Sequence, residues 1–449
     1  MSLHNDPKPQ RRCNRLVSPV SGEPSEAGIP ASAKSRREFL KLMSAAAAAS
    51  VLAPRLWSSE AAPTPRTFQV TANLYAWDLH DEGVDRVLDN LQGMAGINSV
   101  YLVGVMHPER RPFGGPDYPH NPVRKSWTAE DGRCYWHPDP KRYGRVKPRL
   151  SDHGWLNDTD WLRVLGDAAR KRGLKLGVEF SHTLIDCDRM QHELADLAQR
   201  DLHGEIAPVG AIKWLRPPCP NHPETRSLAL GMTEDVVANH GVDFVQSCIM
   251  SFDPAPPEKG GGCFCEHCRR AAKEWGLDLR GVQTTLLANP QSGGALNDWA
   301  RFREKSVNRF YAMLSEGAHA INPRAEVRYN LHSTWAYARY GINPVQLREH
   351  VDSMRLSYYA EQEGTEAEMG KKKEWLAGMQ KIIGGGFPLH APVAMRLKAT
   401  PDLIREGVRM VVDAGMVGMT ASHYDGATFP RLRAIREGLI ECGLENARA

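Results

Sequence analysis

Short apolar runs alternate with longer amphipathic segments from residue 68 onward. The apolar runs are rich in Val, Ile, Tyr and Phe, and several are apolar nearly throughout, as expected of strands that are covered on both faces. These runs predict strands over 68–75, 99–106, 174–180, 242–250, 326–332, 353–359, 390–395 and 417–424. Helical periodicity predicts helices over 84–94, 159–172, 189–200, 224–239, 296–320, 344–350, 366–382, 401–413 and 430–440.

Strands that alternate with helices in this way are typical of a single (β/α)8 TIM-type barrel, which is an α/β fold. The competing fold, an open doubly wound sheet, requires a Gly-rich phosphate-binding turn after its first strand, and residues 75–83 provide none. We therefore predict one barrel domain over residues 67–449.

Long connections follow the second and fourth predicted strands, over 107–158 and 251–296. Both leave from the C-terminal ends of strands, the face on which barrel enzymes build their sites. The first connection is rich in aromatic residues, which predicts either a cover over a groove or an excursion without a catalytic role.

Residues 1–66 have a different character. The pair Arg36 and Arg37 directly precedes an alanine-rich apolar run over 42–53, and small residues follow it. This order is typical of a secretory signal, and the paired arginines are read by the twin-arginine (Tat) translocase. The run is shorter than the roughly 20 apolar residues that span a bilayer. We expect a disordered leader with a signal peptide, and export to the periplasm or the cell exterior.

Removal of this leader changes the charge of the protein. The leader holds 10 Lys/Arg and 5 Asp/Glu, and the remaining chain holds 47 and 48, so the formal net charge falls from +4 to −1. The basic character of the whole chain is therefore no argument for a nucleic acid or an anionic membrane as a partner. No second apolar run approaches membrane length, which predicts a mature protein without a membrane span.

The C-terminal ends of the predicted strands carry carboxylate, imidazole and aromatic side chains, which suit a carbohydrate substrate. Hydrolysis of a glycosidic bond requires two carboxyl groups in different environments, one protonated and one ionised. The catalytic candidates are Glu179, Glu361 and Asp425, and each has a structural ion pair as its alternative. The residues predicted to bind the sugar are Trp77, His80, His107, His182, His332, Trp335, Tyr359, Arg396 and His423.

The central segment resembles a known group of proteins. It reads CPNHPETR over 219–226, GVDF over 241–244 and GCFCEHC over 262–268. These motifs are similar to the central region of the hypothetical glycosyl hydrolase families, (β/α)8 proteins of the group that includes the family 10-like glycosylhydrolases. The resemblance implies a barrel and a carbohydrate substrate. Where such families commonly carry an Asp near the end of the fourth strand, this chain has Cys248, with Asp253 five residues later.

The cysteine cluster is the sharpest local motif. The thiols of Cys263, Cys265 and Cys268 suit a structural zinc, with Cys219, Cys248 or His267 as a fourth ligand. Because Tat substrates cross the membrane already folded, a metal loaded in the cytoplasm is compatible with export. A disulfide within the cluster is the alternative in an oxidising compartment. In either case the cluster is predicted to hold in place the long connection that follows the fourth predicted strand.

These observations predict an exported carbohydrate-active barrel, a glycoside hydrolase that uses a carboxylate pair and requires no cofactor for hydrolysis. The first alternative is a metal-dependent sugar isomerase, epimerase or lyase whose ligands come from Glu179, His182, His332, Glu361, His423 and Asp425. The second is a catalytically inactive carbohydrate-binding barrel, which the replacement of the strand-four Asp by Cys248 keeps open.

Export supplies the first test. Replacing Arg36 and Arg37 together by Lys should trap the precursor in the cytoplasm, because the arginine pair is the address that the Tat receptor reads. Fractionation followed by immunoblotting measures the outcome, and export of the double mutant at the parental level would remove the Tat assignment.

Overall fold

The computed structural model describes residues 68–106, 117–129, 133–180, 193–206, 218–247, 251–332 and 340–444. All of these belong to one compact unit, Pro65–Ala449. Residues 1–66 lie outside the described residues, so the twin-arginine signal stays a prediction.

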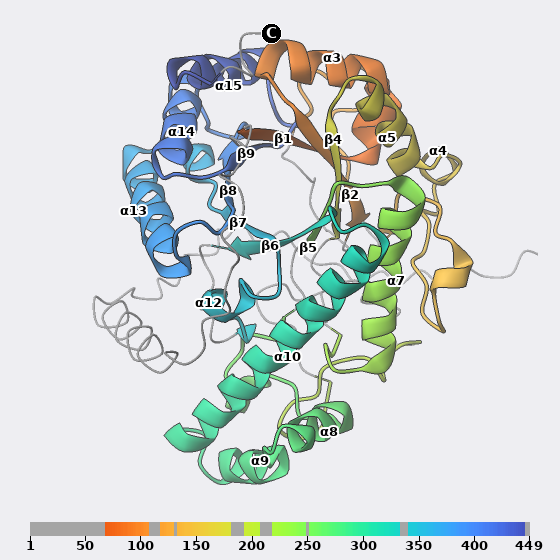
Figure 1. The fold of residues 1–449 in the computed structure, drawn as a ribbon, viewed down its shortest axis with the longest axis vertical. Helices are drawn as coiled ribbons and strands as arrows, with labels where there is room; N and C mark the ends of the chain where they lie inside the picture. The colour runs from red at the N-terminus through yellow and green to blue at the C-terminus, as the bar shows by residue number, and fades with distance from the viewer. Residues whose placement is uncertain are drawn as a thin grey trace, which may run out of the picture. The chain divides into compact units, whose positions relative to one another are not determined.

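Parallel strands form a closed barrel at the centre of this unit (Figure 1). The strands are β1 (Gln69–Leu74), β2 (Ser99–Met106), β4 (Lys175–Phe180), β5 (Phe244–Ser247), β6 (Glu326–His332), β7 (Ser353–Ser357), β8 (Leu389–Ala394) and β9 (Gly418–Ser422). Each pairs with the next in this order, and β1 pairs with both β2 and β9, which closes the sheet. The short strand β3 (Arg133–Cys134) adds to β2 antiparallel. The predicted (β/α)8 TIM-type barrel is confirmed.

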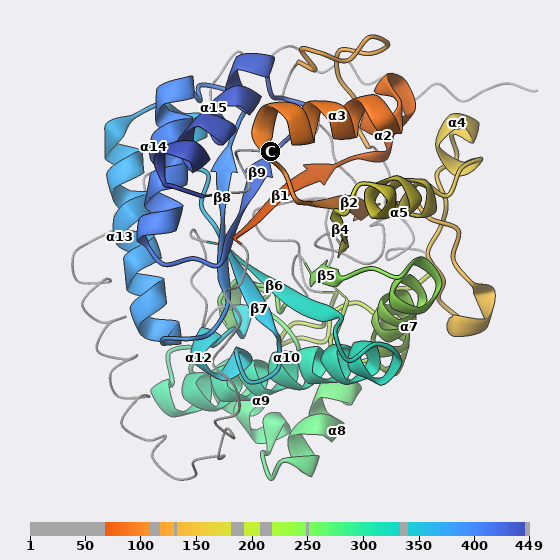
Figure 2. The ribbon, with the colours of Figure 1, turned by 45° about the horizontal axis from the view of Figure 1, so that its top comes forward.

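Helices surround the strands (Figures 1 and 2). They are α2 (Ala76–Glu82), α3 (Val84–Ala95), α4 (Gly154–Asn157), α5 (Trp161–Lys171), α7 (Pro223–His240), α8 (Glu266–Glu274), α9 (Leu279–Ala288), α10 (Gly293–Ile321), α12 (Pro344–Leu347), α13 (Glu366–Ile383), α14 (Pro401–Asp413) and α15 (Phe429–Glu441). Short 3-10 turns lie at η1 (Pro140–Arg142), η2 (Pro257–Lys259) and η3 (Ala360–Glu363).

Local signals fix the ends of several helices. The side chain of Thr400 accepts a hydrogen bond from the backbone of Leu403, and Pro401 fills the first helical position, so α14 begins where the sequence predicts. At the seam of the barrel, a Cβ on Gly418 would lie 2.5 Å from the carbonyl oxygen of Gln69. Glycine therefore allows β9 to approach β1 closely enough to close the sheet.

The N-terminal end of the barrel interior is filled by a buried charged group. The Arg328 guanidinium lies 4.3 Å from the centre of the Phe244 ring and donates to Glu326 at 2.9 and 3.0 Å. Although burial alone would raise the pKa of Glu326, Arg328 and His390 lower it to about 2. This end of the barrel is therefore closed by an ion pair.

One predicted helix is wrong, and other helices form where none was predicted. The described part of the predicted helix over 189–200 forms turns and isolated bridges, including Ala198 with Pro218. Helices α8 and α9 form in a connection for which no helix was predicted. In α8 only Cys268 and Ala272 are buried, so its apolar stripe is too narrow for periodicity to reveal.

The connection after β5 extends away from the barrel. Figures 1 and 2 show α8 and α9 beyond α10, outside the ring of helices around the strands. Among the described residues, no helix has both the length and the apolar character that crossing a bilayer requires.

Candidate active site at the carboxyl ends of the strands

A buried arginine occupies the centre of the barrel mouth. Arg355 of β7 is 2% exposed, and its Nη2 donates to the Tyr359 hydroxyl at 2.8 Å and to Ser422 Oγ, on β9, at 3.0 Å. Its Nη1 lies 3.8 Å from Oε2 of Glu179 on β4. Because these partners come from separate strands, the guanidinium lies inside the barrel.

Glu179 lies at this mouth, as the sequence predicts. It also accepts a hydrogen bond from the side-chain amide of Gln246 on β5. Its side chain is 13% exposed. A cation and an amide donor together stabilise a negative charge on this carboxylate.

Neutral imidazoles lie beside the arginine. The pKa of His332 falls to about 4 because of burial and the charge of Arg355. The pKa of His423 lies well below its usual value because of burial, Arg396 and Arg355. His423 Nδ1 is 2.9 Å from the hydroxyl of Tyr75, and the ring of Tyr359 lies 6.3 Å from His332 and 6.0 Å from His423. The structure thus brings His332, Tyr359, Arg396 and His423 to one site.

A second carboxyl group lies at the end of β9. Asp425 is 1% exposed, its Oδ1 accepts from the backbone of Gly426 at 2.7 Å, and its Oδ2 has no hydrogen-bond partner among the described residues. Burial raises the pKa of Asp425 to about 7, against the opposing charge of Arg396. At neutral pH this carboxyl group is therefore protonated in a large fraction of molecules.

Asp78 is a further carboxyl group near Asp425. Its Oδ2 accepts from the backbone of Tyr75 at 2.9 Å, and its Oδ1 is buried without a partner among the described residues. Burial, and next the charge of Asp425, raise the pKa of Asp78 well above its usual value. Each of two buried carboxyls of this kind makes ionisation of the other less favourable.

Tyr75 links the two halves of the mouth. Its pKa is raised well above the usual value by burial, and both Asp425 and Glu179 raise it further. Both carboxyl groups therefore lie within electrostatic range of one phenol. This arrangement supplies carboxyl groups in opposite environments, one neutral and one paired with a cation.

The described part of the connection after β2 covers this region. His120 Nδ1 lies 2.9 Å from Glu82, and its Nε2 lies 2.9 Å from the carbonyl oxygen of Tyr424. Tyr118 is fully buried, and its pKa is raised by burial and then by Asp425. Of the two alternatives for this connection, the packing against Glu82 and against the residues that follow β9 favours a cover.

The prediction that Glu361 faces the mouth is wrong. Its carboxylate pairs with Lys372 of α13, and both side chains are fully buried. The other oxygen accepts from the backbone of Ala394 at 3.1 Å, and the carboxylate lies against Gly407 of α14. Glu361 is thus enclosed between β8 and the outer helices, which is the structural ion pair that the sequence left as its alternative.

Two predicted sugar-binding residues also lie elsewhere. Trp77 is fully buried, with its ring stacked on Tyr75 at 4.5 Å, so it belongs to the core and not to a sugar-binding surface. His80 lies 4.8 Å from Trp155 and 5.9 Å from Trp161, against α4 and α5. The remaining predicted site residues, His107, His182 and Trp335, lie outside the described residues, as does Cys248.

The cysteine cluster gains its fourth member from the segment before α7. The Sγ atoms of Cys219, Cys263, Cys265 and Cys268 all lie within 4.8 Å of one another. The Cys219 sulfur is 3.6 Å from that of Cys265 and 3.4 Å from that of Cys268, and no disulfide joins the described cysteines. A tetrahedron with Zn–S bonds of about 2.3 Å has S–S edges of about 3.8 Å, close to these separations.

Sequence reasoning missed Arg355 and Gln246 as site residues, and it placed Asp78 at the barrel mouth without pairing it with Asp425. Arg355 and Gln246 are polar residues within short, buried strands, which is a signal that sequence alone offers. Asp78 follows β1 by four residues, so its position at a strand end was readable, but its proximity to Asp425 depends on the closure of the barrel.

Comparisons with known proteins concern the fold. No family model and no curated protein matches the chain. The cold-adapted β-galactosidase from Rahnella sp. R3 is 13% identical with a TM-score of 0.55, over 85% of this chain and 57% of that structure. The β-galactosidase from Bacillus circulans sp. alkalophilus is 14% identical with a TM-score of 0.52, over 83% and 55%.

The α-L-fucosidase isoenzyme 2 from Paenibacillus thiaminolyticus is 12% identical with a TM-score of 0.51, over 85% of this chain and 50% of that structure. The chain therefore spans less than two thirds of the length of these three structures. At such low sequence identities the structural similarity shows the fold alone. That fold is a barrel of the kind found in glycoside hydrolases.

The buried pair of Glu361 and Lys372 supports a stability prediction. Glu361→Gln should lower the free energy of unfolding by about 3–5 kcal/mol, because it leaves the Lys372 ammonium buried without a counter-ion. Adding Lys372→Met should recover much of this loss. Unfolding in guanidinium chloride measures the free energy of unfolding of both variants. As a control, Asp298→Asn removes one partner of an exposed pair with Arg301 and should change this free energy little. A Glu361→Gln variant as stable as the parent would contradict the assignment.

Proposed function

We propose that the protein is an exported glycoside hydrolase in which Asp425 is the general acid and Glu179 is the ionised partner. The proposal rests on the two carboxyl groups in opposite environments near Tyr75. The hydrolase-type barrel and the resemblance of residues 219–276 to hypothetical glycosyl hydrolase families both support it. The Tat signal predicted from Arg36 and Arg37 supports export to the periplasm or cell exterior.

In this proposal each carboxyl group has one chemical task. A general acid must be protonated at the working pH, and burial gives Asp425 a pKa of about 7. It donates its proton to the oxygen of the leaving group as the glycosidic bond breaks. Glu179, held by Gln246 and Arg355, supplies the negative charge that stabilises the positive charge on the sugar ring in the transition state. Water then adds to the anomeric carbon and gives up one proton to a carboxylate of the pair, which completes the hydrolysis.

The neighbouring side chains position these groups. Burial and the charge of Asp425 raise the pKa of Asp78, so the two neighbouring carboxyls resist carrying a negative charge at the same time. The neutral imidazoles of His332 and His423 and the phenol of Tyr359 can exchange hydrogen bonds with sugar hydroxyls without adding charge. The positive charge of Arg396 acts on Asp425, and that of Arg355 lies beside Glu179, so each arginine offsets the negative charge of one carboxyl group.

The substrate is proposed by class. The structural neighbours are named as β-galactosidases and an α-L-fucosidase, so β-galactosides and α-L-fucosides are the first compounds to test. The metal-dependent alternative stays a prediction. Within the part of the chain that the structure describes, the four cysteines form the group of potential metal ligands, and Glu179, His332 and Asp425 do not gather into another.

We also propose that Cys219, Cys263, Cys265 and Cys268 hold a structural zinc. Thiolates in a tetrahedron are a preferred zinc site, and a closed set of four leaves no position for catalysis. The ligands join the segment before α7 to the start of α8. The metal would thus staple the connection after β5 to the body of the protein.

The catalytic assignment predicts a difference between two variants. Glu179→Gln should abolish hydrolysis of both p-nitrophenyl glycosides and the corresponding oligosaccharides, because it removes the stabilising charge. Asp425→Asn should abolish hydrolysis of oligosaccharides but spare aryl glycosides in part, since p-nitrophenolate leaves without a proton. In the parent, kcat for oligosaccharides should fall as the pH rises through about 7, as Asp425 loses its proton.

Glu361→Gln, assayed well below its melting temperature, provides the control and should retain turnover because Glu361 lies away from the mouth. Equal losses on both substrate types in Asp425→Asn would remove the general-acid role. Sugar binding without turnover by the parent on every glycoside would favour the inactive carbohydrate-binding barrel.

The zinc proposal predicts an effect on stability rather than on chemistry. Cys265→Ser should release the metal and lower the melting temperature while leaving residual activity, because the cluster staples a connection. Elemental analysis and thermal unfolding measure the two effects. Cys442→Ser, which changes a cysteine outside the cluster, should keep the full metal content. A Cys265→Ser protein that is as stable as the parent but inactive would instead indicate a catalytic thiol.

A further inference from the structure

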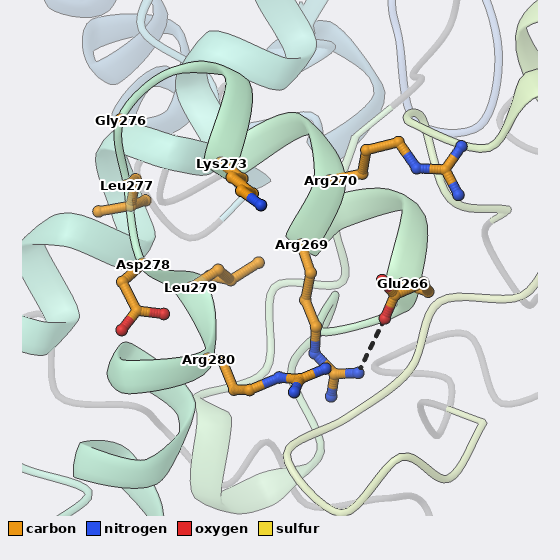
Figure 3. A pocket seen from close by; sticks show the side chains of 9 residues that line it. All are labelled: Glu266, Arg269, Arg270, Lys273, Gly276, Leu277, Asp278, Leu279 and Arg280. Atoms are coloured by element: carbon orange, nitrogen blue, oxygen red, sulfur yellow. Dashed lines mark hydrogen bonds and ion pairs between the residues drawn. The ribbon is translucent and has the colours of Figure 1, made fainter.

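A pocket of about 690 Å³ lies on the excursion after β5, between α8 and the start of α9 (Figure 3). Its charged lining consists of Arg269, Arg270, Lys273 and Arg280, with Glu266 and Asp278 as the acidic members. This surplus of positive charge contrasts with the near-neutral balance of the chain after residue 66.

The acidic members are already engaged. Glu266 pairs with Arg269 at 3.4 Å, and the Asp278 side chain caps α9 by accepting from the backbone of Gly281 at 2.9 Å. Arg269 is also oriented by the side-chain carbonyl of Gln283 at 2.9 Å. The lining therefore contains one fixed guanidinium whose position does not depend on a ligand.

The other cations lack partners. Within the described ranges, the side chains of Arg270, Lys273 and Arg280 make no hydrogen bond or ion pair, and all three residues are exposed. Figure 3 shows Arg269 of α8 and Arg280 of α9 extending toward the same part of the pocket. Like charges that converge repel one another, and a bound anion would relieve this repulsion.

The size and position of the pocket narrow the ligand class. A volume of about 690 Å³ lies within the range of sites for small molecules and can accept a sugar unit together with its oxyanion group. The N-terminal end of α9 lies at the pocket, where the carboxylate of Asp278 caps it. Helices α8 and α9, which supply the lining of the pocket, lie outside the ring of helices around the strands (Figure 1).

We infer that this pocket is a second binding site, which holds an oxyanion-bearing unit of an acidic glycan, either a sulfate ester or a uronate carboxylate. The choice of a glycan rests on the proposed function, whereas the preference for an oxyanion rests on the pocket alone. Such a site would retain the protein on an acidic polymer while the barrel mouth acts on a glycosidic bond.

The test compares polymers that share a backbone. Purified protein should bind dextran sulfate and not dextran in titration calorimetry, and binding to polygalacturonate decides whether a carboxylate also serves. Lys273→Gln with Arg280→Gln should weaken binding about tenfold or more, because an exposed ion pair contributes up to about a factor of five in affinity. Lys373→Gln with Lys381→Gln, which removes two exposed cations of α13, should leave affinity within about twofold.

Each outcome bears on one claim. Equal losses in the two double variants, or equally tight binding of single-stranded DNA, would show attraction to any polyanion and overturn the inference. Turnover of neutral glycosides is measured separately on the same proteins. If the protein hydrolyses no glycoside but the pocket variants still lose dextran sulfate binding, the proposed function fails while the oxyanion site stands. If it hydrolyses glycosides but binds no anionic polymer, the proposed function stands and the oxyanion site fails.

Discussion

The burial of the Arg355 guanidinium inside the barrel is the constraint on which the candidate site depends. A buried charge is tolerated only with hydrogen-bond partners and a counter-ion, and Arg355 obtains these from Tyr359, Ser422 and Glu179. Because the partners come from different parts of the barrel, one residue fixes their relative positions. Burial lowers the pKa of both His332 and His423, and the charge of Arg355 lowers both values further, which favours neutral imidazoles at the site.

The two ends of the barrel interior use charge differently. At the N-terminal end, Glu326 accepts hydrogen bonds from Arg328 and Ser353, and its pKa falls to about 2, which is the behaviour of a structural ion pair. At the C-terminal end, Asp425 keeps one oxygen without a partner among the described residues, and its pKa rises to about 7. This asymmetry agrees with the general division of barrels into a stability face and a functional face.

The excursion after β5 depends on its own interactions. The clustered thiols join the residues before α7 to the start of α8, and α8 then supplies three of the cations of the pocket. In the function that we propose, the metal organises a binding surface and takes no part in bond cleavage. The barrel mouth and the excursion would thus divide catalysis and retention between separate elements of one chain.

The sequence by itself determined the class of fold, because strands alternate with helices and no Gly-rich phosphate-binding turn follows the first strand, which favours a barrel over a doubly wound sheet. The bounds of α14 and β6 also follow from local signals alone. It also determined that Glu179, His332, Tyr359 and His423 end barrel strands, since strand direction sends those ends to one face.

The sequence could not distinguish a carboxylate that faces the mouth from one that faces the outer helices. Glu361 and Asp425 both follow strands, yet Lys372 of α13, eleven residues after Glu361, holds Glu361 in a buried ion pair. Asp78 meets Asp425 only because β1 pairs with β9, a contact between residues at opposite ends of the domain that local patterns do not encode.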